Sequence, residues 1–265
     1  MCLTFHTIPI LLLLFFYTSS GLLAQEKSYT KEDYELVIRF SSEKLQEDSL
    51  KNNEYFKSRA QAYYALEEFG LALRDFNSYL RMNPTDSYTY YNRGALKNIL
   101  GQFELAINDF SRAIDFSTEN PSDFYFARGA AYQTLKNYPK AISDYNESIE
   151  CNPRNQEALN NLGLLFIEKK DYQTAMSYLD KALQIDADYI SSLINRAYVL
   201  IELGHYKKAL LDLRYALKLS PDNPYANNYM GYFLYKQNKK MEACKYFKIV
   251  TSAGIKPLID IKYCE

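Results

Sequence analysis

The chain has 265 residues, of which 48% are hydrophobic and 24% are charged. This composition supports a packed core and excludes both a disordered chain and a protein with many membrane spans. Glycine and proline together number 17, roughly half the usual share, which argues against a turn-rich all-β fold. The 31 basic and 32 acidic residues nearly balance, and no basic stripe of the kind typical of nucleic-acid binders stands out. Two histidines are too few for a histidine-based metal or catalytic site, so we expect no enzyme activity and no cofactor.

Residues 1–24 carry no Lys, Arg, Asp or Glu, and they contain an apolar run at 8–16 followed by small polar residues. This pattern is typical of a secretory signal peptide, although its positive start is missing, and we place cleavage after Ala24. The mature chain is then expected in the periplasm or outside the cell, with no membrane span. An uncleaved anchor is the alternative, because residues 5–24 are just long enough to cross a bilayer.

The following part of the sequence repeats with a period of about 34 residues, in units 53–86, 87–121, 122–155, 156–189, 190–223 and 224–257. In every unit position 8 is small, position 20 is alanine and position 24 is bulky and apolar or aromatic. The residues at position 8 are Ala60, Gly94, Gly129, Gly163, Ala197 and Gly231. The apolar spacing predicts two helices per unit, separated by a turn, so each unit is expected to be a helical hairpin.

This pattern, with Pro84, Pro153 and Pro221 at position 32, resembles the tetratricopeptide repeat family, and the ending of the chain is similar to exported bacterial members. The resemblance covers residues 53–257. It implies an all-α fold, an α-solenoid forming a right-handed superhelix of about six hairpins. We expect a capping helix within 25–52, with Thr30 as its N-cap, and another at 258–265, because terminal repeats otherwise leave an apolar face uncovered.

The resemblance also implies a non-catalytic scaffold that binds a protein partner, as an extended peptide or a helix, in a concave groove lined by the first helix of each hairpin. Groove positions hold seven tyrosines and more acids than bases, which disfavours a nucleic-acid ligand. The candidate partner-binding residues are Tyr91, Asn92, Phe126, Asn161, Asn195, Tyr198 and Tyr232. A glycan-binding module of the cell envelope is the alternative. The high tyrosine content, 26 of 265 residues, would also explain the pattern without any binding role.

Chaperone-binding members of the family hold a C-terminal carboxylate with two Lys, two Asn and one Arg. The matching positions here are Lys57, Gln61, Asn92, Asp123 and Ala127, and only the first and third agree. Asp123 places negative charge where the family has positive charge. The sequence therefore argues against a chaperone-adaptor role.

Positions 7 and 23 vary together within this one chain. Four units carry Arg and Asp there, as Arg59 with Asp75, Arg93 with Asp109, Arg128 with Asp144, and Arg196 with Asp212. The other two units carry Leu162 with Tyr178 and Met230 with Tyr246. We predict structural ion pairs that fix the register of the hairpins, stronger than exposed pairs if they are partly buried.

Three cysteines follow the predicted leader. Cys244 lies on the last predicted helix of the repeats, and Cys264 follows it by twenty residues, beyond the turn at Gly254. In an oxidising compartment we expect these two to form a disulfide. The alternative is two small buried hydrophobic residues. Cys151 is expected to be a lone thiol without function.

Overall fold

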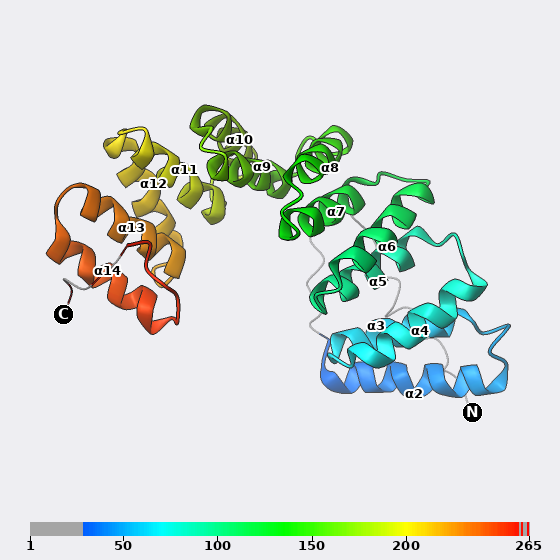
Figure 1. Cartoon of the computed structure of the whole chain (residues 1–265). Coiled ribbons are helices and arrows are strands. Elements are labelled where there is room, and N and C mark those ends of the chain that lie inside the picture. The colour runs from blue at the N-terminus through cyan, green and yellow to red at the C-terminus, as the bar shows by residue number, and fades with distance from the viewer. Residues whose placement is uncertain (1–28, 260, 262–263, 265) are drawn as a thin grey trace, which may run out of the picture. The chain divides into compact units, whose positions relative to one another are not determined.

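The computed structural model describes residues 29–259, 261 and 264, so the predicted signal peptide lies outside the described residues. The described residues form thirteen α-helices, which confirms the all-α expectation (Figure 1). The first, α2 (Lys31–Glu47), precedes six helical hairpins. None of the helices in this part of the chain is both long and apolar enough to cross a membrane.

Each hairpin has a first helix of 12 or 13 residues and a second helix of 13 or 14. The first helices are α3 (Glu54–Ala65), α5 (Ser87–Ile99), α7 (Ser122–Thr134), α9 (Gln156–Glu168), α11 (Ile190–Glu202) and α13 (Pro224–Lys236). The second helices are α4 (Phe69–Met82), α6 (Phe103–Asp115), α8 (Tyr138–Cys151), α10 (Tyr172–Ile185), α12 (Tyr206–Leu219) and α14 (Lys240–Ser252). The residue at position 17 of the repeat thus begins every second helix.

The chain divides into two compact units, residues up to Glu119 and residues from Asn120 onward. In the first unit α2 to α6 pack successively, each helix against the next. In the second unit α7 to α14 do the same, and α11 also contacts α9 and α13. The first helices of the last three hairpins therefore form one continuous layer.

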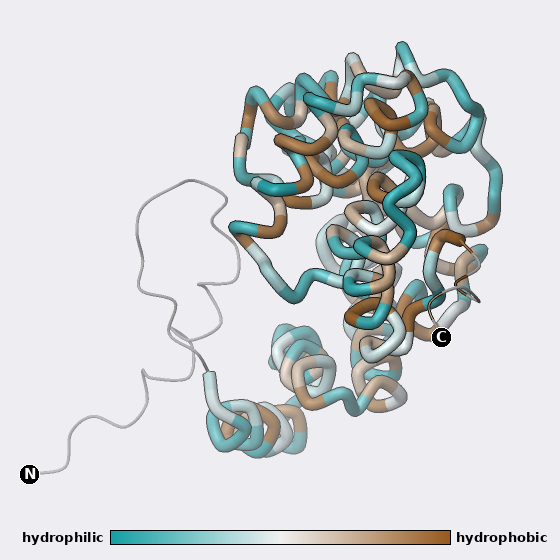
Figure 2. The backbone as a smooth tube through the Cα atoms, turned by 90° about the vertical axis from the view of Figure 1, so that its left-hand side faces the viewer, coloured by the Kyte–Doolittle hydropathy of each residue, from teal (hydrophilic) through white to brown (hydrophobic). Residues whose placement is uncertain are grey.

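The core of each hairpin depends on the small residue at position 8 and the bulky residue at position 24. A Cβ atom added to Gly94 would lie 2.8 Å from the ring of Phe110, and one added to Gly231 would lie 2.5 Å from the ring of Phe247. The alanine at position 20 is fully buried in all six units. Figure 2 shows hydrophobic residues recurring along the helical coils, with hydrophilic residues at many of the turns. The repeat signature is therefore a rule of side-chain packing between the two helices of a hairpin.

The turn inside every hairpin has the same backbone geometry. Position 15 has a positive φ in all six units, between 57° and 78°. The six residues are Glu67, Gly101, Lys136, Lys170, Gly204 and Asn238. In the first hairpin the N–H of Glu67 donates to Tyr64 O, and the N–H of Glu68 donates to Tyr63 O. This is the Schellman arrangement, which satisfies the last carbonyl groups of a helix.

At the N-terminal end α2 begins with a capping box. The Asp33 N–H donates to the Thr30 hydroxyl oxygen, and the Thr30 N–H donates to the Asp33 carboxylate. The predicted N-cap is therefore present, and α2 lies within the expected range.

The expected capping helix at 258–265 does not include Leu258 and Ile259, which form a bend after residues 255–257 without regular structure. Among the residues described beyond them, Cys264 has 3₁₀ geometry. The amide of Asn228 holds the start of this segment, because its Nδ2 donates to Lys256 O at 3.3 Å and its Oδ1 accepts from the Leu258 N–H at 2.9 Å.

Candidate functional site

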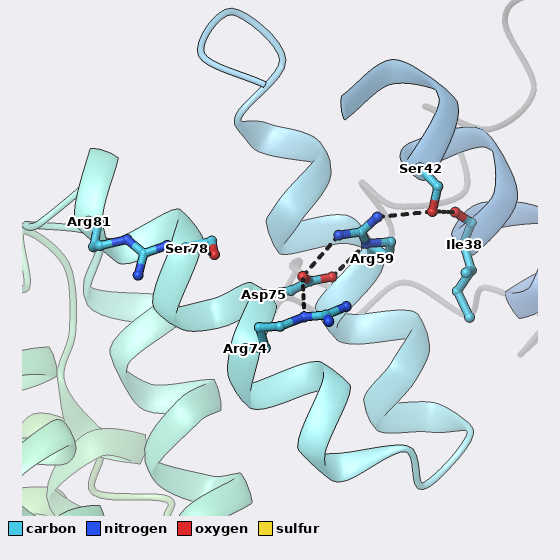
Figure 3. A network of polar contacts seen from close by, with 7 residues as sticks. All are labelled: Ile38, Ser42, Arg59, Arg74, Asp75, Ser78 and Arg81. Carbon is cyan, nitrogen blue, oxygen red and sulfur yellow. Dashed lines mark hydrogen bonds and ion pairs between the residues drawn. The ribbon is translucent and has the colours of Figure 1, made fainter. Parts of the chain in front are cut away.

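The first sequence-derived site is the set of Arg–Asp pairs, and Figure 3 shows the pair in the first hairpin. Arg59 Nε donates to Asp75 Oδ2 at 2.6 Å, and Nη2 donates to Oδ1 at 3.0 Å. The remaining nitrogen, Nη1, donates to the hydroxyl of Ser42 on α2 at 2.9 Å. Ser42 in turn donates to the carbonyl of Ile38. The guanidinium thus bonds the second helix of its own hairpin and the preceding helix.

The same two-point geometry recurs in the other three units. Arg93 bonds Asp109 at 2.8 and 2.6 Å, and both bonds between Arg128 and Asp144 are 2.8 Å. Both bonds between Arg196 and Asp212 are also 2.8 Å. All four pairs proposed from covariation therefore form within their own hairpins.

Two of these arginines have a second partner, at position 25 of the preceding hairpin, that was not predicted from the sequence. Arg93 Nη1 donates to Asn77 at 2.6 Å, and Arg196 Nη1 donates to Asp180 at 2.8 Å. The hydrogen bond to Asp212 raises the pKa of Arg196 above its ordinary value. These arginines therefore join consecutive hairpins, which is a structural role.

Two of the three candidate amides, Asn161 and Asn195, are connected through Asn160 inside the second unit. Asn160 Oδ1 accepts from Ser192 Oγ and from Asn195 Nδ2, each at 3.0 Å. Asn195 is buried, so its amide is occupied by the core and is not available to a ligand. The expectation that Asn195 binds a partner is therefore wrong, because its side chain instead joins α9 to α11.

Asn161 and Phe126 surround the buried Tyr145 of the same unit. Asn161 Nδ2 donates to the Tyr145 hydroxyl oxygen at 3.2 Å, and the Tyr145 hydroxyl donates to Gln133 Oε1 at 2.7 Å. The Phe126 ring lies 5.7 Å from the Tyr145 ring. Burial raises the pKa of Tyr145 to about 12. Asn161 and Phe126 are half-buried, and both contact the core residue Tyr145.

Tyr198 and Tyr232 come together in a cluster on α11 and α13. Their ring centroids are 6.1 Å apart, and Tyr229 lies 5.3 Å from Tyr198. The Tyr232 hydroxyl donates to Glu202 Oε1 at 2.6 Å, and Lys236 Nζ lies 3.5 Å from the same oxygen. Burial and the hydrogen bond to Glu202 raise the pKa of Tyr232. We call these five residues the tyrosine cluster; their helices lie in the continuous layer of first helices.

Tyr91 and Asn92 lie in the first unit, on α5, and both are half-buried. The Tyr91 ring is 5.9 Å from the ring of Phe110, which belongs to the core of the second hairpin. Among the candidate residues of the second unit, Tyr198 and Tyr232 contact each other directly, and we take their surroundings as the candidate site.

Lys57, which matches the carboxylate clamp, is already paired within the first unit. Its Nζ lies 2.9 Å from Asp86 Oδ2, and the Tyr79 hydroxyl donates to the same oxygen at 3.0 Å. Burial opposes the charge on Asp86, but the hydrogen bond from Lys57 holds the pKa of Asp86 below its ordinary value. A lysine held in this way is poorly placed to bind a free C-terminal carboxylate.

The prediction of binding residues from the sequence did not include three members of the tyrosine cluster, Tyr229, Glu202 and Lys236. Glu202 and Lys236 lie at position 13 of their units, which the resemblance assigns to the groove, but neither carried a feature that distinguished it from a solvated charge. Tyr229 lies at position 6, where three other units have asparagine. The contacts between side chains of α11 and α13 identify all three residues.

Cys244 and Cys264 form a disulfide, with their Cα atoms 5.4 Å apart, which is the pairing proposed from the sequence. Cys151 is half-buried with a free thiol, and burial raises its pKa. His205 is exposed at the start of α12. No group of His, Cys, Asp and Glu within the described ranges has the arrangement needed to hold a metal ion.

Comparison with known proteins agrees with this geometry. Four tetratricopeptide repeat models match the chain, at residues 58–124, 122–155, 144–176 and 162–228. The chain belongs to the tetratricopeptide repeat family. Proteins of this family are protein–protein interaction scaffolds, and their fold is typically non-catalytic.

The similar proteins share the repeat but differ in length. Anaphase-promoting complex subunit 3 of Schizosaccharomyces pombe is 25% identical over 209 residues, which cover 77% of this chain and 31% of that protein. A tetratricopeptide repeat protein from Parabacteroides merdae has a TM-score of 0.66 at 21% identity, covering 77% of this chain and 80% of that structure. YrrB, described as a tetratricopeptide repeat protein with an unusual peptide-binding site, has a TM-score of 0.56 at 20% identity and covers 70% of this chain and 95% of its own. The chain spans about a third or less of the length of the curated relatives it matches.

Proposed function

We propose that this tetratricopeptide repeat protein binds an extended peptide segment of a partner through the tyrosine cluster on α11 and α13. The observation that carries the proposal is the three-ring group of Tyr198, Tyr229 and Tyr232, beside the ion pair of Glu202 and Lys236. The rings are half-buried and already held by one another. A ligand that contacts them therefore meets large apolar surfaces at a small cost in side-chain entropy.

The polar groups beside the rings suit a peptide backbone. The carboxylate of Glu202 accepts from Tyr232, and it has a second oxygen for a backbone N–H of the ligand. Lys236 lies over the Tyr232 ring, 5.3 Å from its centroid, and has further N–H donors for a carbonyl group. An apolar surface with one acceptor and one donor is a common arrangement for binding an extended chain. The described peptide site of the YrrB structure supports this choice of ligand.

We further infer that the protein works in the cell envelope, after removal of residues 1–24. The charge-free apolar run supports export, and the disulfide between Cys244 and Cys264 supports an oxidising compartment. The intact mass of the protein isolated from an envelope fraction tests the point. A mature chain that begins at Gln25 agrees with the proposal, and a full-length chain contradicts it.

The binding proposal is tested by affinity capture from envelope extracts with the tagged full chain. The variant is Tyr198→Ala with Tyr232→Ala, and the matched control is Tyr225→Ala, since Tyr225 is an exposed tyrosine on α13 that is not a member of the cluster. We expect the control to capture the same partner as the wild type and the double variant to lose it. Because the cluster is half-buried, circular dichroism must first show that the double variant is folded. A second variant, Glu202→Gln, keeps the shape of the side chain and should weaken capture.

A partner captured equally well by both tyrosine variants would contradict the proposal. A glycan array probed with the same proteins tests the alternative ligand class. Glycan binding that disappears in the double variant, with no peptide captured, would assign the cluster to sugars instead.

A further inference from the structure

The charge of the chain is divided unequally, although its sum is close to zero. Residues 1–202 contain 20 basic and 27 acidic side chains, whereas residues 203–265 contain 11 basic and five acidic side chains. Most of the basic residues of this last segment lie on the final two hairpins, at α12 and α14. The surplus of positive charge is therefore concentrated at one end of the second unit.

Part of this charge surrounds a hollow between α12 and α14. The hollow has a volume of about 650 Å³, and α13 lies at its base. Its apolar lining residues are Leu210, Leu217, Met230, Phe233, Leu234 and Tyr246. Leu210, Leu217 and Tyr246 are half-buried, so they leave apolar surface open to a ligand.

The rim of the hollow is basic. Arg214 and Lys218 extend from α12, Lys239 and Lys245 from the α14 side, and Glu242 is the one acid in the lining. Glu242 is 3.5 Å from Lys239, so that pair is internally balanced. Within the described ranges no carboxylate lies within ion-pair distance of Arg214, Lys218 or Lys245. Three exposed cations thus flank the apolar lining, and none of them forms an ion pair with another residue that the structure describes.

Another hollow on the second helices provides a comparison within the same unit. It lies between α8 and α10, has a volume of about 560 Å³, and includes Ile149, Leu159 and Ile185 in its lining. Its charged lining residues are Glu150 and Lys181, so its charges balance. Both hollows lie between two consecutive second helices, and the surplus of positive charge belongs to the one between α12 and α14.

We propose that the hollow between α12 and α14 is a second docking site, for an acidic amphipathic segment of a partner protein. Apolar side chains of the segment lie on Leu210, Leu217 and Tyr246, and its carboxylates meet Arg214, Lys218 and Lys245. Complementary charge gives such a site its orientation and its selectivity, and the apolar lining gives contact area. This site is independent of the tyrosine cluster, because the residues that line it are not members of that cluster.

The test uses fluorescence anisotropy with the full-length oxidised chain and a labelled synthetic peptide. The peptide contains glutamate and leucine, with the leucines at i, i+3 and i+4 spacing so that it forms one apolar face. A lysine-for-glutamate peptide and a serine-for-leucine peptide are its two counterparts. We expect the acidic peptide to bind, the basic peptide not to bind, and the peptide without leucine to bind weakly.

The decisive variant reverses the charge of the rim. It combines Arg214→Glu, Lys218→Glu and Lys245→Glu. Its matched control is Lys207→Glu with Lys208→Glu and Lys248→Glu, which makes the same change in net charge on the same two helices, away from the lining. We expect the rim variant to lose affinity by about tenfold or more and the control by less than about threefold, because screened charges act mainly over short distances. All substituted residues are exposed, so both variants should fold.

Equal losses in the two variants would overturn the proposal, since they would show only a general effect of net charge. Binding of phosphatidylserine vesicles or duplex DNA that depends on the rim, without peptide binding, would overturn the choice of partner. A dimer that dissociates only in the rim variant, measured by sedimentation, would assign the hollow to a second copy of the chain. The Tyr198→Ala and Tyr232→Ala variant should still bind the peptide, which separates this proposal from the first.

Discussion

Arg196 and Asp212 form a two-point ion pair that joins α11 to α12, with both nitrogen–oxygen distances at 2.8 Å. Arg196 also bonds Asp180 on α10, so one guanidinium links two hairpins. Both residues of the pair are largely buried. We expect Asp212→Asn to lower the free energy of unfolding by about 1–3 kcal/mol, because a partly buried cation loses one of its two charged acceptors. Chemical denaturation of the full chain measures the change.

The chain supplies its own compensating pair, since the fourth hairpin has Leu162 and Tyr178 at these positions. Arg196→Leu combined with Asp212→Tyr should recover most of the stability lost in either single variant. Arg74 is the control, because its Nε lies 3.9 Å from Asp75 and its side chain is well exposed. Arg74→Ala should cost less than about 0.5 kcal/mol. Equal effects at Arg74 and Asp212 would contradict a register-fixing role.

The contact of Gly231 with Phe247 gives a second prediction. Gly231→Ala would place a Cβ atom 2.5 Å from the Phe247 ring, and we expect a loss of about 1–3 kcal/mol despite the better helix propensity of alanine. Adding Phe247→Leu to the Gly231→Ala variant should restore part of the lost stability, because Ala197 and Leu213 form the equivalent pair in the fifth hairpin. Thermal unfolding of the three variants tests this, and a neutral Gly231→Ala would refute the packing argument.

The turn at position 15 predicts a substitution that raises the free energy of unfolding. Lys136 and Lys170 adopt positive φ values of 57° and 60°, which are strained for residues with a Cβ atom. Lys136→Gly should therefore raise the free energy of unfolding by up to about 1 kcal/mol. Gly101→Ala is the matched control and should lower the free energy of unfolding. No atom lies within 4 Å of the added Cβ, so only the φ of 72° opposes the change. A destabilised Lys136→Gly would contradict this account.

Tyr145 makes the second unit sensitive to alkaline pH. Burial raises its pKa to about 12 from an ordinary value of 10.0, so the folded state favours the neutral phenol. The resulting stability is fully present below pH 10 and is lost as the pH rises through about 12. Denaturant titrations at steps across this range should show a steep fall in the wild type and a shallower fall in Tyr145→Phe. Identical slopes would show that Tyr145 is not responsible.

The segment after Gly254 depends on the disulfide and on Asn228. Cys244→Ser with Cys264→Ser should lower stability by about 3 kcal/mol in the chain-entropy model and should speed hydrogen exchange in residues 255–259. A reducing agent should have the same effect on the wild type and none on the double variant. Asn228→Ala should speed exchange at the Leu258 N–H even with the disulfide intact, since that N–H loses its acceptor. Unchanged exchange in all three cases would contradict the role given to this segment.

The sequence predicted the hairpins because their packing is local and repeated. Positions 8, 20 and 24 must fit one another within a single hairpin, so Gly231, Ala243 and Phe247 carry the same information as their equivalents in the other units. The Arg–Asp pairs were predictable for the same reason. Arg196 and Asp212 are 16 residues apart in one unit, and the two positions change together from unit to unit.

Contacts that occur once, or that join different hairpins, depended on the tertiary structure. The tyrosine content suggested an open aromatic groove, but the structure placed Asn195 in the core and brought Tyr229 and Glu202 to Tyr232. The sequence suggested a helix at 258–265, whereas the hydrogen bond from Leu258 to Asn228 holds the start of this segment in a bend. The sequence by itself determined the repeat and its two helices, because short-range sterics and apolar periodicity decide them. Tertiary structure alone decided which polar side chains are occupied by the core and which remain for a partner, because each such choice depends on the neighbouring hairpin.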